Sequence, residues 1–373
     1  MSTAVTVAPT VVRVEAIPVR LRIVNLVEHA GGLSLYAENI IVRVTDSEGA
    51  VGTAEATVRP FIYGETVASV MGLYGGPIQE LLIGRPIWHR ERIRHELDAA
   101  FVHNHCAKAA LDMAMADLAC RHLGTSCHDL FGGWTDRQEV SQLIGIGSPE
   151  VNADLCARLR AEHGIKSFKV KMGQGVEKDV AVLERLRREQ PDALIYIDAN
   201  HAYDLPESMR LLRAVRDLDI AWVEEPVSAD EPLARSRVAA AGFEILGDES
   251  CTTPGEVARE VLAGRSHLVS LKLARTGYIL SDRIRGFCES VGASLIVGSQ
   301  GETGIGTLAN LAYTTAHAST SKHPGELAFF LNLEDDLLTE PLKIVDGHLA
   351  LRDGVGNCVE VDEDKLRHYR IDA

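Results

Sequence analysis

A regular alternation of short β-rich runs and helical runs occupies the chain from about residue 140 to residue 326. Eight strand candidates end at Ile144, Lys171, Asp198, Glu224, Asp248, Lys272, Gly298 and Glu326. Successive ends are 27, 27, 26, 24, 24, 26 and 28 residues apart, the length of one strand, one helix and two short loops. Eight such units predict a parallel α/β barrel. An open doubly wound sheet also alternates in this way, but the even spacing favours closure.

The segments that flank the barrel lack this period. Residues 11–23 and 37–56 alternate apolar and polar residues around a Ser-Glu-Gly turn, which predicts a hairpin. Residues 64–132 are helical in pattern, with Gly124 as a stop. His103 and His105 lie two apart on this predicted helix, so we expect them on different faces, in structural or solvated roles. After Glu326 we expect no eighth helix, but loops and short strands that return to the N-terminal part.

Composition narrows the functional class. The net charge of −15 argues against nucleic acid and anionic membranes as partners. A small anionic substrate stays compatible, because a bound divalent cation reverses the local field. The chain shows no run of about 20 apolar residues and no signal peptide at its start, so we expect a cytoplasmic protein. Seven scattered cysteines without a CxxC predict free thiols in a reducing compartment.

Three consecutive predicted strands end in a carboxylate: Asp198, Glu224 and Asp248. In a parallel barrel the catalytic groups gather at the carboxyl ends of the strands. Any one of these acids alone would be an ordinary rim charge, but three at matching positions would repel each other in a partly dry site. A hard divalent cation, Mg²⁺ or Mn²⁺, resolves this repulsion. The chain offers no histidine and cysteine set to suggest zinc.

Lysines end the strands on either side of these acids. Lys169 and Lys171 are separated by one residue in a strand, so their side chains point the same way. Lys272 lies across the barrel mouth from them. We expect the crowded cations and a nearby metal to lower the pKa of these lysines toward a useful range. A substrate carboxylate held between them is arranged for proton transfer at its α-carbon.

The segment after the seventh strand, GSQGETGIGT, is expected to line the pocket with Ser299, Gln300 and Glu302. It lacks GxGxxG and follows a barrel strand, which argues against dinucleotide binding. Backbone amides at the start of the following helix are expected to meet the far carboxylate of the substrate.

These residues, in this order, resemble the enolase superfamily, specifically its muconate lactonizing enzyme subgroup. The similar segments are SFKVKMG, YIDANHAYD, WVEEPV, LGDES and LKLARTG, with ALDMAMADLACRHLGTSCHDLFGG before the barrel and GSQGETGIGT after strand seven. The resemblance covers essentially the whole chain. It implies an N-terminal α+β capping domain (1–132), a (β/α)7β modified TIM barrel (133–327) and a C-terminal segment that completes the cap (328–373).

The resemblance also assigns roles. It implies that Asp198, Glu224 and Asp248 bind the metal, with Glu249 as the alternative to Asp248. Lys171 becomes the acid/base group on one face of the substrate, and Lys272 becomes the acid/base group or a cation on the other. Lys169 orients the substrate carboxylate and tunes Lys171. Asn200 and Glu249 would hold ligands and lysines in place.

The implied activity is that of a divalent-metal-dependent isomerase, cis,cis-muconate cycloisomerase. One carboxylate attacks the distal double bond and closes the lactone, and a lysine protonates the α-carbon. Whether Lys171 or Lys272 does so, giving syn or anti addition, stays open. Alternatives in the subgroup are o-succinylbenzoate synthase, N-acylamino acid racemase and dipeptide epimerase. An acid-sugar dehydratase would typically use a histidine base on strand seven, but here that strand ends in Gly298–Gln300. A non-catalytic barrel would be expected to have lost a metal ligand or a lysine, and none is missing from this sequence.

Substrate specificity is expected in residues 23–36 and 58–66, with His29 and Tyr63 as candidates, and in Gly301 and Glu326 near the last strands. Dipeptide epimerases usually carry Asp-x-Asp near the last strand, where this chain has PGELAFF, which weakens that alternative. We expect a small dicarboxylate as the substrate. The resemblance also implies a homo-oligomer, from dimer to octamer.

Overall fold

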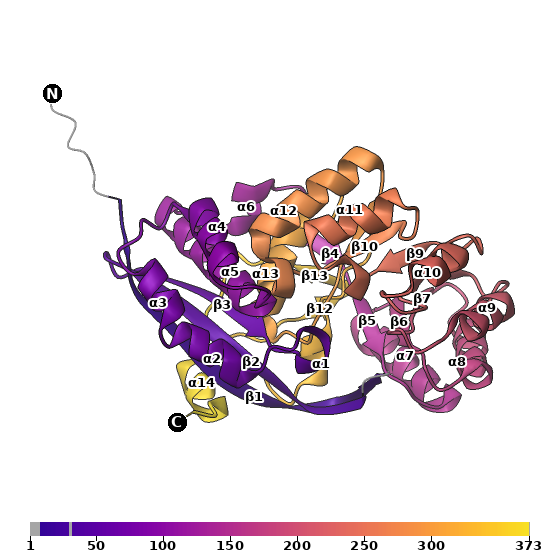
Figure 1. The fold of residues 1–373 in the computed structure, drawn as a ribbon. Helices are drawn as coiled ribbons and strands as arrows, with labels where there is room; N and C mark the ends of the chain where they lie inside the picture. Colours follow the sequence, from indigo (N-terminus) through magenta and orange to yellow (C-terminus); the bar gives the residue numbers. More distant parts are fainter. Residues whose placement is uncertain (1–7, 30–31, 373) are drawn as a thin grey trace.

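The computed structural model describes residues 8–29 and 32–372. Its N-terminal part is an antiparallel sheet in the order β1-β2-β3, covered by helices on one face (Figure 1). The strands are β1 (Val11–His29), β2 (Gly32–Asp46) and β3 (Val51–Thr57). The chain turns between β2 and β3 at Ser47–Gly49, so the predicted hairpin is confirmed.

Six helices follow the N-terminal sheet, and sheet and helices together are called the cap below. They are α1 (Pro60–Tyr63), α2 (Val67–Tyr74), α3 (Pro77–Leu82), α4 (Arg90–Ala100), α5 (His105–Leu123) and α6 (Cys127–Phe131). Helix α5 packs against β3 and ends at Gly124, whose φ of 66° suits glycine. His103 is not helical as expected. It precedes α5 with a φ of 57°, and its ring lies 5.8 Å from that of His105, so the two are neighbours.

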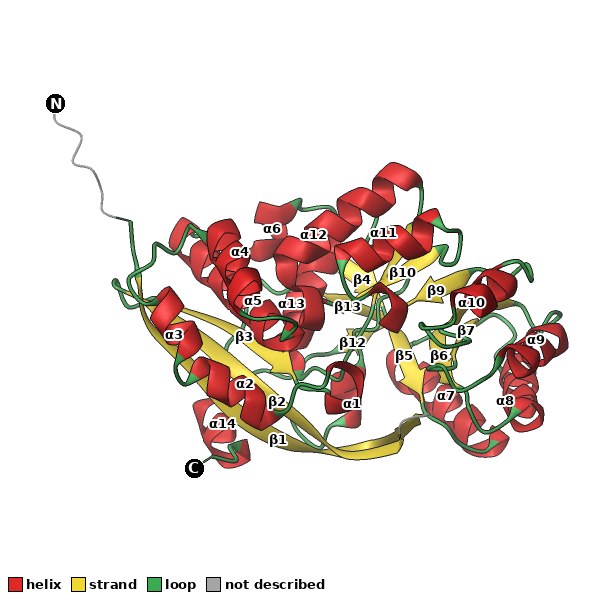
Figure 2. Cartoon of the chain, viewed as in Figure 1, coloured by secondary structure: helices red, strands yellow, loops and turns green. Residues whose placement is uncertain are grey.

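Seven parallel strands form a curled sheet, part of which is labelled in Figure 2. Their order is β11-β10-β9-β8-β7-β6-β5. They are β5 (Ser141–Ile144), β6 (Ser167–Lys171), β7 (Leu194–Asp198), β8 (Ile220–Glu224), β9 (Ile245–Gly247), β10 (Leu268–Leu271) and β11 (Ser294–Val297). Four predicted ends coincide with the observed ones, and the other three strands end one residue earlier. Asp248 and Lys272 therefore come directly after their strands.

A helix follows each of these strands and covers the outside of the barrel. The helices are α7 (Pro149–His163), α8 (Val176–Glu189), α9 (Leu205–Ala214), α10 (Pro232–Ala239), α11 (Pro254–Leu262), α12 (Leu273–Val291) and α13 (Gly304–Ala316). Inside the barrel, Tyr196, Trp222, Leu246, Leu268 and Ile296 form a separate apolar cluster. Because side chains two residues apart in a strand share a face, Asp198 and Glu224 point to the same side as Tyr196 and Trp222.

The eighth predicted strand is not a strand. Gly325 forms only a single parallel bridge with Val140. The Ser141 amide donates to the Gly325 carbonyl at 2.7 Å, and the Glu326 amide donates to the Val297 carbonyl at 2.9 Å. This short extended segment thus connects β5 with β11 before the chain turns into the 3₁₀ helix η2 (Phe329–Asn332). The fold class, a (β/α)7β barrel with an N-terminal α+β cap, is confirmed.

The C-terminal chain returns to the cap, as expected. Ile371 donates to the carbonyl of Pro18 in β1 at 3.1 Å, and Leu333 forms a bridge with Ile23. The remaining elements are β4 (Arg137–Glu139), β12 (Ile344–Val345), β13 (His348–Ala350), the 3₁₀ helix η1 (Glu249–Cys251) and α14 (Glu363–Tyr369). Within the described residues, no helix is long and apolar enough to cross a membrane.

Candidate active site

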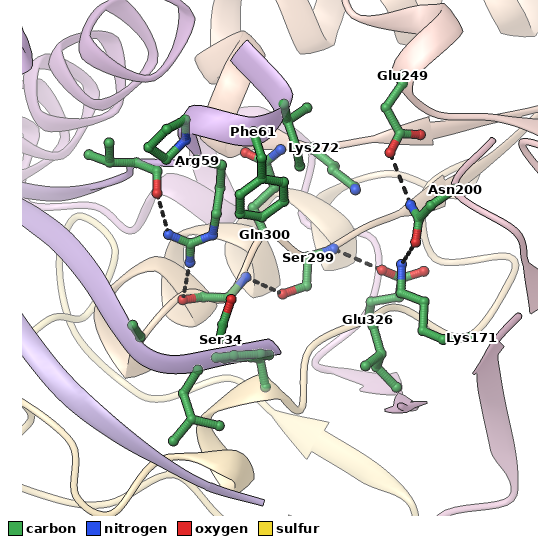
Figure 3. A pocket seen from close by; sticks show the side chains of 18 of the residues that line it. Ser34, Arg59, Phe61, Lys171, Asn200, Glu249, Lys272, Ser299, Gln300 and Glu326 are labelled. Atoms are coloured by element: carbon green, nitrogen blue, oxygen red, sulfur yellow. Dashed lines mark hydrogen bonds between the residues drawn. The ribbon is translucent and has the colours of Figure 1, made fainter. Parts of the chain in front are cut away.

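A cavity of 870 Å³ lies between the carboxyl ends of the barrel strands and the cap (Figure 3). The cap contributes two segments to its wall, residues 34–38 and 58–62, together with Ile23. The barrel contributes mostly polar residues, namely Ser141, Gln142, Lys171, Asn200, His201, Ser228, Asp230, Glu249, Lys272, Ser299, Gln300, Gly301 and Glu326. Polar groups that converge on one large cavity mark the candidate active site.

The two lysines of β6 point the same way but reach different depths. Val170 between them is buried in the apolar core. Lys169 is 1% exposed, and its ammonium lies 2.7 Å from Glu224, 3.0 Å from Glu326 and 3.1 Å from Asp198. Lys171 lines the cavity. It donates to Asp198 Oδ2 and to Asn200 Oδ1, both at 2.6 Å.

Lys272 enters the same cavity from the far side of the carboxylates. Strands β7, β8 and β9 lie between the lysine strand β6 and β10, which Lys272 follows. The Lys272 ammonium lies 2.5 Å from Asp248 Oδ2. The other oxygen of Asp248 accepts from Arg275 at 2.6 Å. Lys171 and Lys272 therefore flank the three acids.

Arg275 was not predicted as a site residue. It stands three residues after Lys272 in the segment LKLARTG, is almost fully buried, and also donates to the hydroxyl of Tyr63 at 3.1 Å. An arginine one helical turn beyond a site lysine was the available signal, because residues three apart on a helix are neighbours.

The three carboxylates are buried together but differ in charge balance. Burial alone would raise the pKa of Asp198, but Lys169 and Lys171 lower it. Lys272 and Arg275 likewise hold the pKa of Asp248 well below its usual range, against the effect of burial. The pKa of Glu224 is raised well above its usual range by burial and by the charges of Asp198 and Asp248. Negative charge is therefore least compensated at Glu224.

The expected lowering of the lysine pKa values is wrong for Lys169 and Lys272. Burial lowers the pKa of Lys169, but the charges of Asp198 and Glu224 raise it well above its ordinary value. Asp248 raises the pKa of Lys272 in the same way. The nearest neighbours of both ammonium groups are carboxylates rather than cations, and this decides the direction.

As the described side chains stand, no group of three or more histidine, cysteine or acidic residues is arranged to hold a metal ion. Lysines and Arg275 occupy oxygens of Asp198 and Asp248. The chemistry of the donor set nevertheless fits a hard cation: three buried carboxylates repel each other, and burial beside Asp198 and Asp248 raises the pKa of Glu224 even though Lys169 lies 2.7 Å from its Oε2. A cation would require Asp198 and Asp248 to turn from their lysines.

Asn200 and Glu249 lie beside Lys171. Asn200 Nδ2 donates to Glu249 Oε1 at 3.0 Å, while Asn200 Oδ1 accepts from the lysine. Asp248, not Glu249, makes the contacts to Lys272 and Arg275.

Sequence reasoning missed a buried acid, Glu225, which holds the backbone that directly follows β9. Glu225, the second acid of WVEEPV, accepts from the backbone amides of Asp248 at 2.6 Å and Ser250 at 3.0 Å. Arg235 donates to the other Glu225 oxygen at 2.6 Å. Two adjacent acids at a strand end were the available signal, since successive side chains of a strand face opposite ways.

The loop after β11 agrees with the expectation only in part. Ser299, Gln300 and Gly301 line the cavity, but Glu302 is not among its lining residues. The Glu302 carboxylate is buried and accepts from the hydroxyl of Ser299 at 2.5 Å and the amide of Gln300 at 3.0 Å. Because the carboxylate satisfies donors of its own loop, it shapes the cavity wall from behind.

The amides at the start of α13 are already occupied, so the expectation that they meet a substrate carboxylate is wrong. Glu55 of β3 accepts from the amides of Thr303 at 3.0 Å and Gly306 at 2.8 Å. Asp336 accepts from the amide of Gly304 at 2.9 Å. Two carboxylates of the protein itself cap this helix, as its positive end favours.

Three further candidates have different outcomes: Tyr63 departs from the expectation, Glu326 agrees with it, and the side chain of His29 is not described. The hydroxyl of Tyr63 lies between Arg275 and Gln300, and Tyr63 is not among the lining residues. Glu326 lines the cavity and accepts from Tyr196 at 2.9 Å and the Ser299 amide at 3.0 Å. His29 ends β1, but its side chain lies outside the described part of the structure.

Arg59 is a cation of the cap that sequence reasoning missed. It lines the cavity, donates to the Gly301 carbonyl at 3.1 Å and to its neighbouring Val58 carbonyl at 2.6 Å, and so links the cap to the loop after β11 (Figure 3). It lies in the segment 58–66 that was expected to govern specificity.

Comparison with known protein families places the chain. Residues 13–132 match the model "Mandelate racemase / muconate lactonizing enzyme, N-terminal domain", and residues 152–365 match "Enolase C-terminal domain-like". Among curated proteins, the L-Ala-D/L-Glu epimerase of Bacillus subtilis is 32% identical over 77% of this chain and 78% of its own length. The o-succinylbenzoate synthase of Geobacillus stearothermophilus is 30% identical over 89% of this chain and 88% of its own.

Solved structures agree with this placement. The muconate lactonizing enzyme of Mycobacterium smegmatis complexed with muconolactone has a TM-score of 0.95 and 40% identity, covering 97% of this chain and 100% of that one. The dipeptide epimerase of Enterococcus faecalis complexed with Mg and a dipeptide has a TM-score of 0.89 and 25% identity, covering 94% and 99%. The chain therefore belongs to the enolase superfamily, in its muconate lactonizing enzyme subgroup.

Proposed function

We propose that this protein is a divalent-metal-dependent isomerase that converts cis,cis-muconate to its lactone. The observation that carries the proposal is that Lys171 and Lys272 reach one cavity from opposite sides of three buried carboxylates. This arrangement can move protons on either face of a bound acid. Similarity to a muconate lactonizing enzyme over nearly the whole chain supports the choice of substrate.

In this proposal Asp198, Glu224 and Asp248 hold Mg²⁺ or Mn²⁺. The cation, when bound, would stabilise the negative charge that develops on the substrate carboxylate. The solved relative complexed with Mg supports the choice of metal. Lys169 is too deeply buried for a large role in substrate contact, so its part is to hold Asp198 and Glu224 in place and to compensate their charge.

The proton transfer is assigned to the two lysines that line the cavity, Lys171 and Lys272. As one substrate carboxylate oxygen bonds to the distal double bond, electrons shift toward the other carboxylate, and the α-carbon then takes a proton from a lysine ammonium. Lys272 lines the cavity on one face of the bound acid and can donate from that side. Lys171 stands on the other face, so the face of the α-carbon that receives the proton shows which lysine donates it.

A substrate with an acid at each end fits the cavity charges. The far carboxylate has no free amide at the start of α13, because Glu55 and Asp336 occupy those amides. Arg59 on the cap side is the cation nearest to the loop after β11 in this wall, and we assign it to that carboxylate.

A second candidate is o-succinylbenzoate synthesis or racemization of an N-succinylated amino acid. The cavity of 870 Å³ is large for a six-carbon diacid, and this observation favours a longer substrate. Relatives named o-succinylbenzoate synthase and N-succinylamino acid racemase, both 30% identical, support this alternative, and the epimerase relatives support a dipeptide in the same way. The segment PGELAFF near the last strand carries Glu326 but no Asp-x-Asp pair, which weakens the dipeptide alternative.

The test is an ultraviolet assay of the purified chain with Mn²⁺ on cis,cis-muconate, beside a succinylated substrate and a dipeptide. We expect muconate absorbance to fall, and a chelator to stop the reaction. Lys171→Ala and Lys272→Ala should each lose nearly all turnover, whereas Lys166→Ala, at an exposed position directly before β6, should keep it. Turnover of only the succinylated substrate would refute the first choice, and full activity of both lysine variants would refute the mechanism.

We further propose that the chain forms a homo-oligomer in a reducing cytoplasm. The seven cysteines are all free, which supports the compartment. Light scattering on a sizing column measures the oligomeric state directly, and a monomer would contradict this part.

A further inference from the structure

Two consecutive residues after β7 adopt a backbone conformation that side chains other than glycine rarely take. Asn200 has a φ of 41° and His201 a φ of 61°. The Asn200 amide donates to Asp198 Oδ1, and the His201 amide donates to the Glu225 carbonyl, both at 3.0 Å. Such strain persists where the surroundings over-determine it, and it gathers at functional sites. Here the turn brings both side chains to Glu249.

A continuous chain of contacts leads from the cavity lysine to the histidine. Lys171 donates to Asn200 Oδ1 at 2.6 Å, and Asn200 Nδ2 donates to Glu249 Oε1 at 3.0 Å (Figure 3). The other oxygen, Glu249 Oε2, lies 3.6 Å from His201 Nε2. His201 Nδ1 lies 3.0 Å from the Val227 carbonyl, and because a carbonyl only accepts, Nδ1 donates there. The imidazole therefore turns Nε2 toward the glutamate.

Charge explains why the histidine matters to Glu249. Glu249 Oε2 is buried and has no hydrogen bond from the described residues, so the nearby imidazole is its source of compensation. Two acids face the ring: Glu249, and Glu225 at 3.9 Å, which is itself paired with Arg235. Although burial lowers the pKa of His201, these acids raise it to about 9. At neutral pH the ring is a cation that donates from Nδ1 to the Val227 carbonyl and turns Nε2 toward Glu249.

We propose that His201 is a positioning residue for Lys171: its ring fixes Glu249 against Asn200, and Asn200 thereby fixes the lysine ammonium at the cavity. Lys272 is held by Asp248 directly and does not share this chain of contacts. That Lys171 carries a proton rests on the proposed function, whereas the contact between His201 and Glu249 does not. Loss of His201 should therefore impair one face of the substrate and spare the other.

The first test needs no substrate. The full chain, labelled at the histidine rings, is titrated by NMR with and without Glu249→Gln. We expect the midpoint of His201 to fall from about 9 toward the ordinary 6.5 when the glutamate loses its charge. His348, whose Nδ1 also contacts a backbone carbonyl at 2.8 Å, is the internal control and should not move. An unchanged His201 midpoint would overturn the proposal, whatever the enzyme's substrate is.

The second test uses whichever substrate the activity screen identifies. For His201→Gln we expect kcat to fall about 10- to 100-fold, as is typical when a supporting partner of a site residue is lost, with KM changed less than about twofold. His201→Arg, which restores a cation, should recover most of kcat. For a substrate whose α-proton exchanges on both faces in D₂O, deuterium entry from the Lys171 face should slow and entry from the Lys272 face should not. Equal losses in the Gln and Arg variants, or on both faces, would overturn the proposal and leave His201 a folding role.

Discussion

Glu55 should make the stability of this protein fall as the pH rises, by a calculable amount. This cap residue is 1% exposed and accepts hydrogen bonds from Asn39 Nδ2 at 2.6 Å, the Thr303 hydroxyl at 2.7 Å and the Gly306 amide at 2.8 Å. It therefore joins β3 to the start of α13. The loop just before this helix forms one wall of the cavity, so the same contact couples stability to the shape of the site.

The magnitude follows from the pKa of the carboxyl. Burial raises the pKa of Glu55 from 4.5 to about 7, although hydrogen bonds from Thr303 and Gly306 act to lower it. A carboxyl whose pKa is raised by folding favours the protonated form in the folded state. Its contribution is fully present below pH 4.5 and is lost as the pH rises through 7. At about 1.4 kcal/mol per unit, the loss is about 3 kcal/mol.

Urea unfolding of the wild type and of Glu55→Gln between pH 4.5 and 8.5 measures this loss. The amide does not titrate, so the free energy of unfolding of the wild type should fall by about 3 kcal/mol relative to the variant across this range. Comparing slopes with pH removes any constant cost of the substitution. Glu184→Gln, at an exposed position of α8, should leave the pH dependence unchanged. Parallel curves for wild type and Glu55→Gln would refute the reasoning.

Three further predictions concern the site and its supports. Gly301→Ala should lower Tm and raise KM, because the φ of Gly301 is 88° and an added Cβ would lie 2.5 Å from the Arg59 guanidinium. The control Gly286→Ala, in open space on α12, should leave Tm and KM unchanged. Equal Tm values for the two variants would contradict the prediction. Arg235→Met should lower the free energy of unfolding in urea by about 3–5 kcal/mol, since it removes the cation paired with the buried Glu225 carboxylate. A loss below about 1 kcal/mol would contradict this prediction. Glu224→Gln should weaken Mn²⁺ binding about tenfold or more by electron paramagnetic resonance; unchanged affinity would remove it from the ligand set.

The sequence by itself determined the barrel and the order of its strand ends. The spacing of 24 to 27 residues locates the ends of the seven observed strands to within one residue, and the alternation of side chains in a strand determines which ones share a side. For this reason the ends at Lys171, Asp198 and Glu224 were predicted correctly, as was the shared side of Lys169 and Lys171. These features depend on local periodicity, which one sequence records directly.

Only the tertiary structure decided how the charges balance. Asp248 and Lys272 meet across 24 residues of chain, and the resulting contact raises the lysine pKa where crowding of cations predicted a fall. Glu55 reaches the start of α13 across 248 residues and takes the amides expected for substrate. Such pairings arise from the side-by-side packing of barrel strands and from the docking of the cap on the barrel, and neither leaves a period in the sequence. Burial then amplifies each of them, because in the interior an unpaired charge costs far more than it does in water.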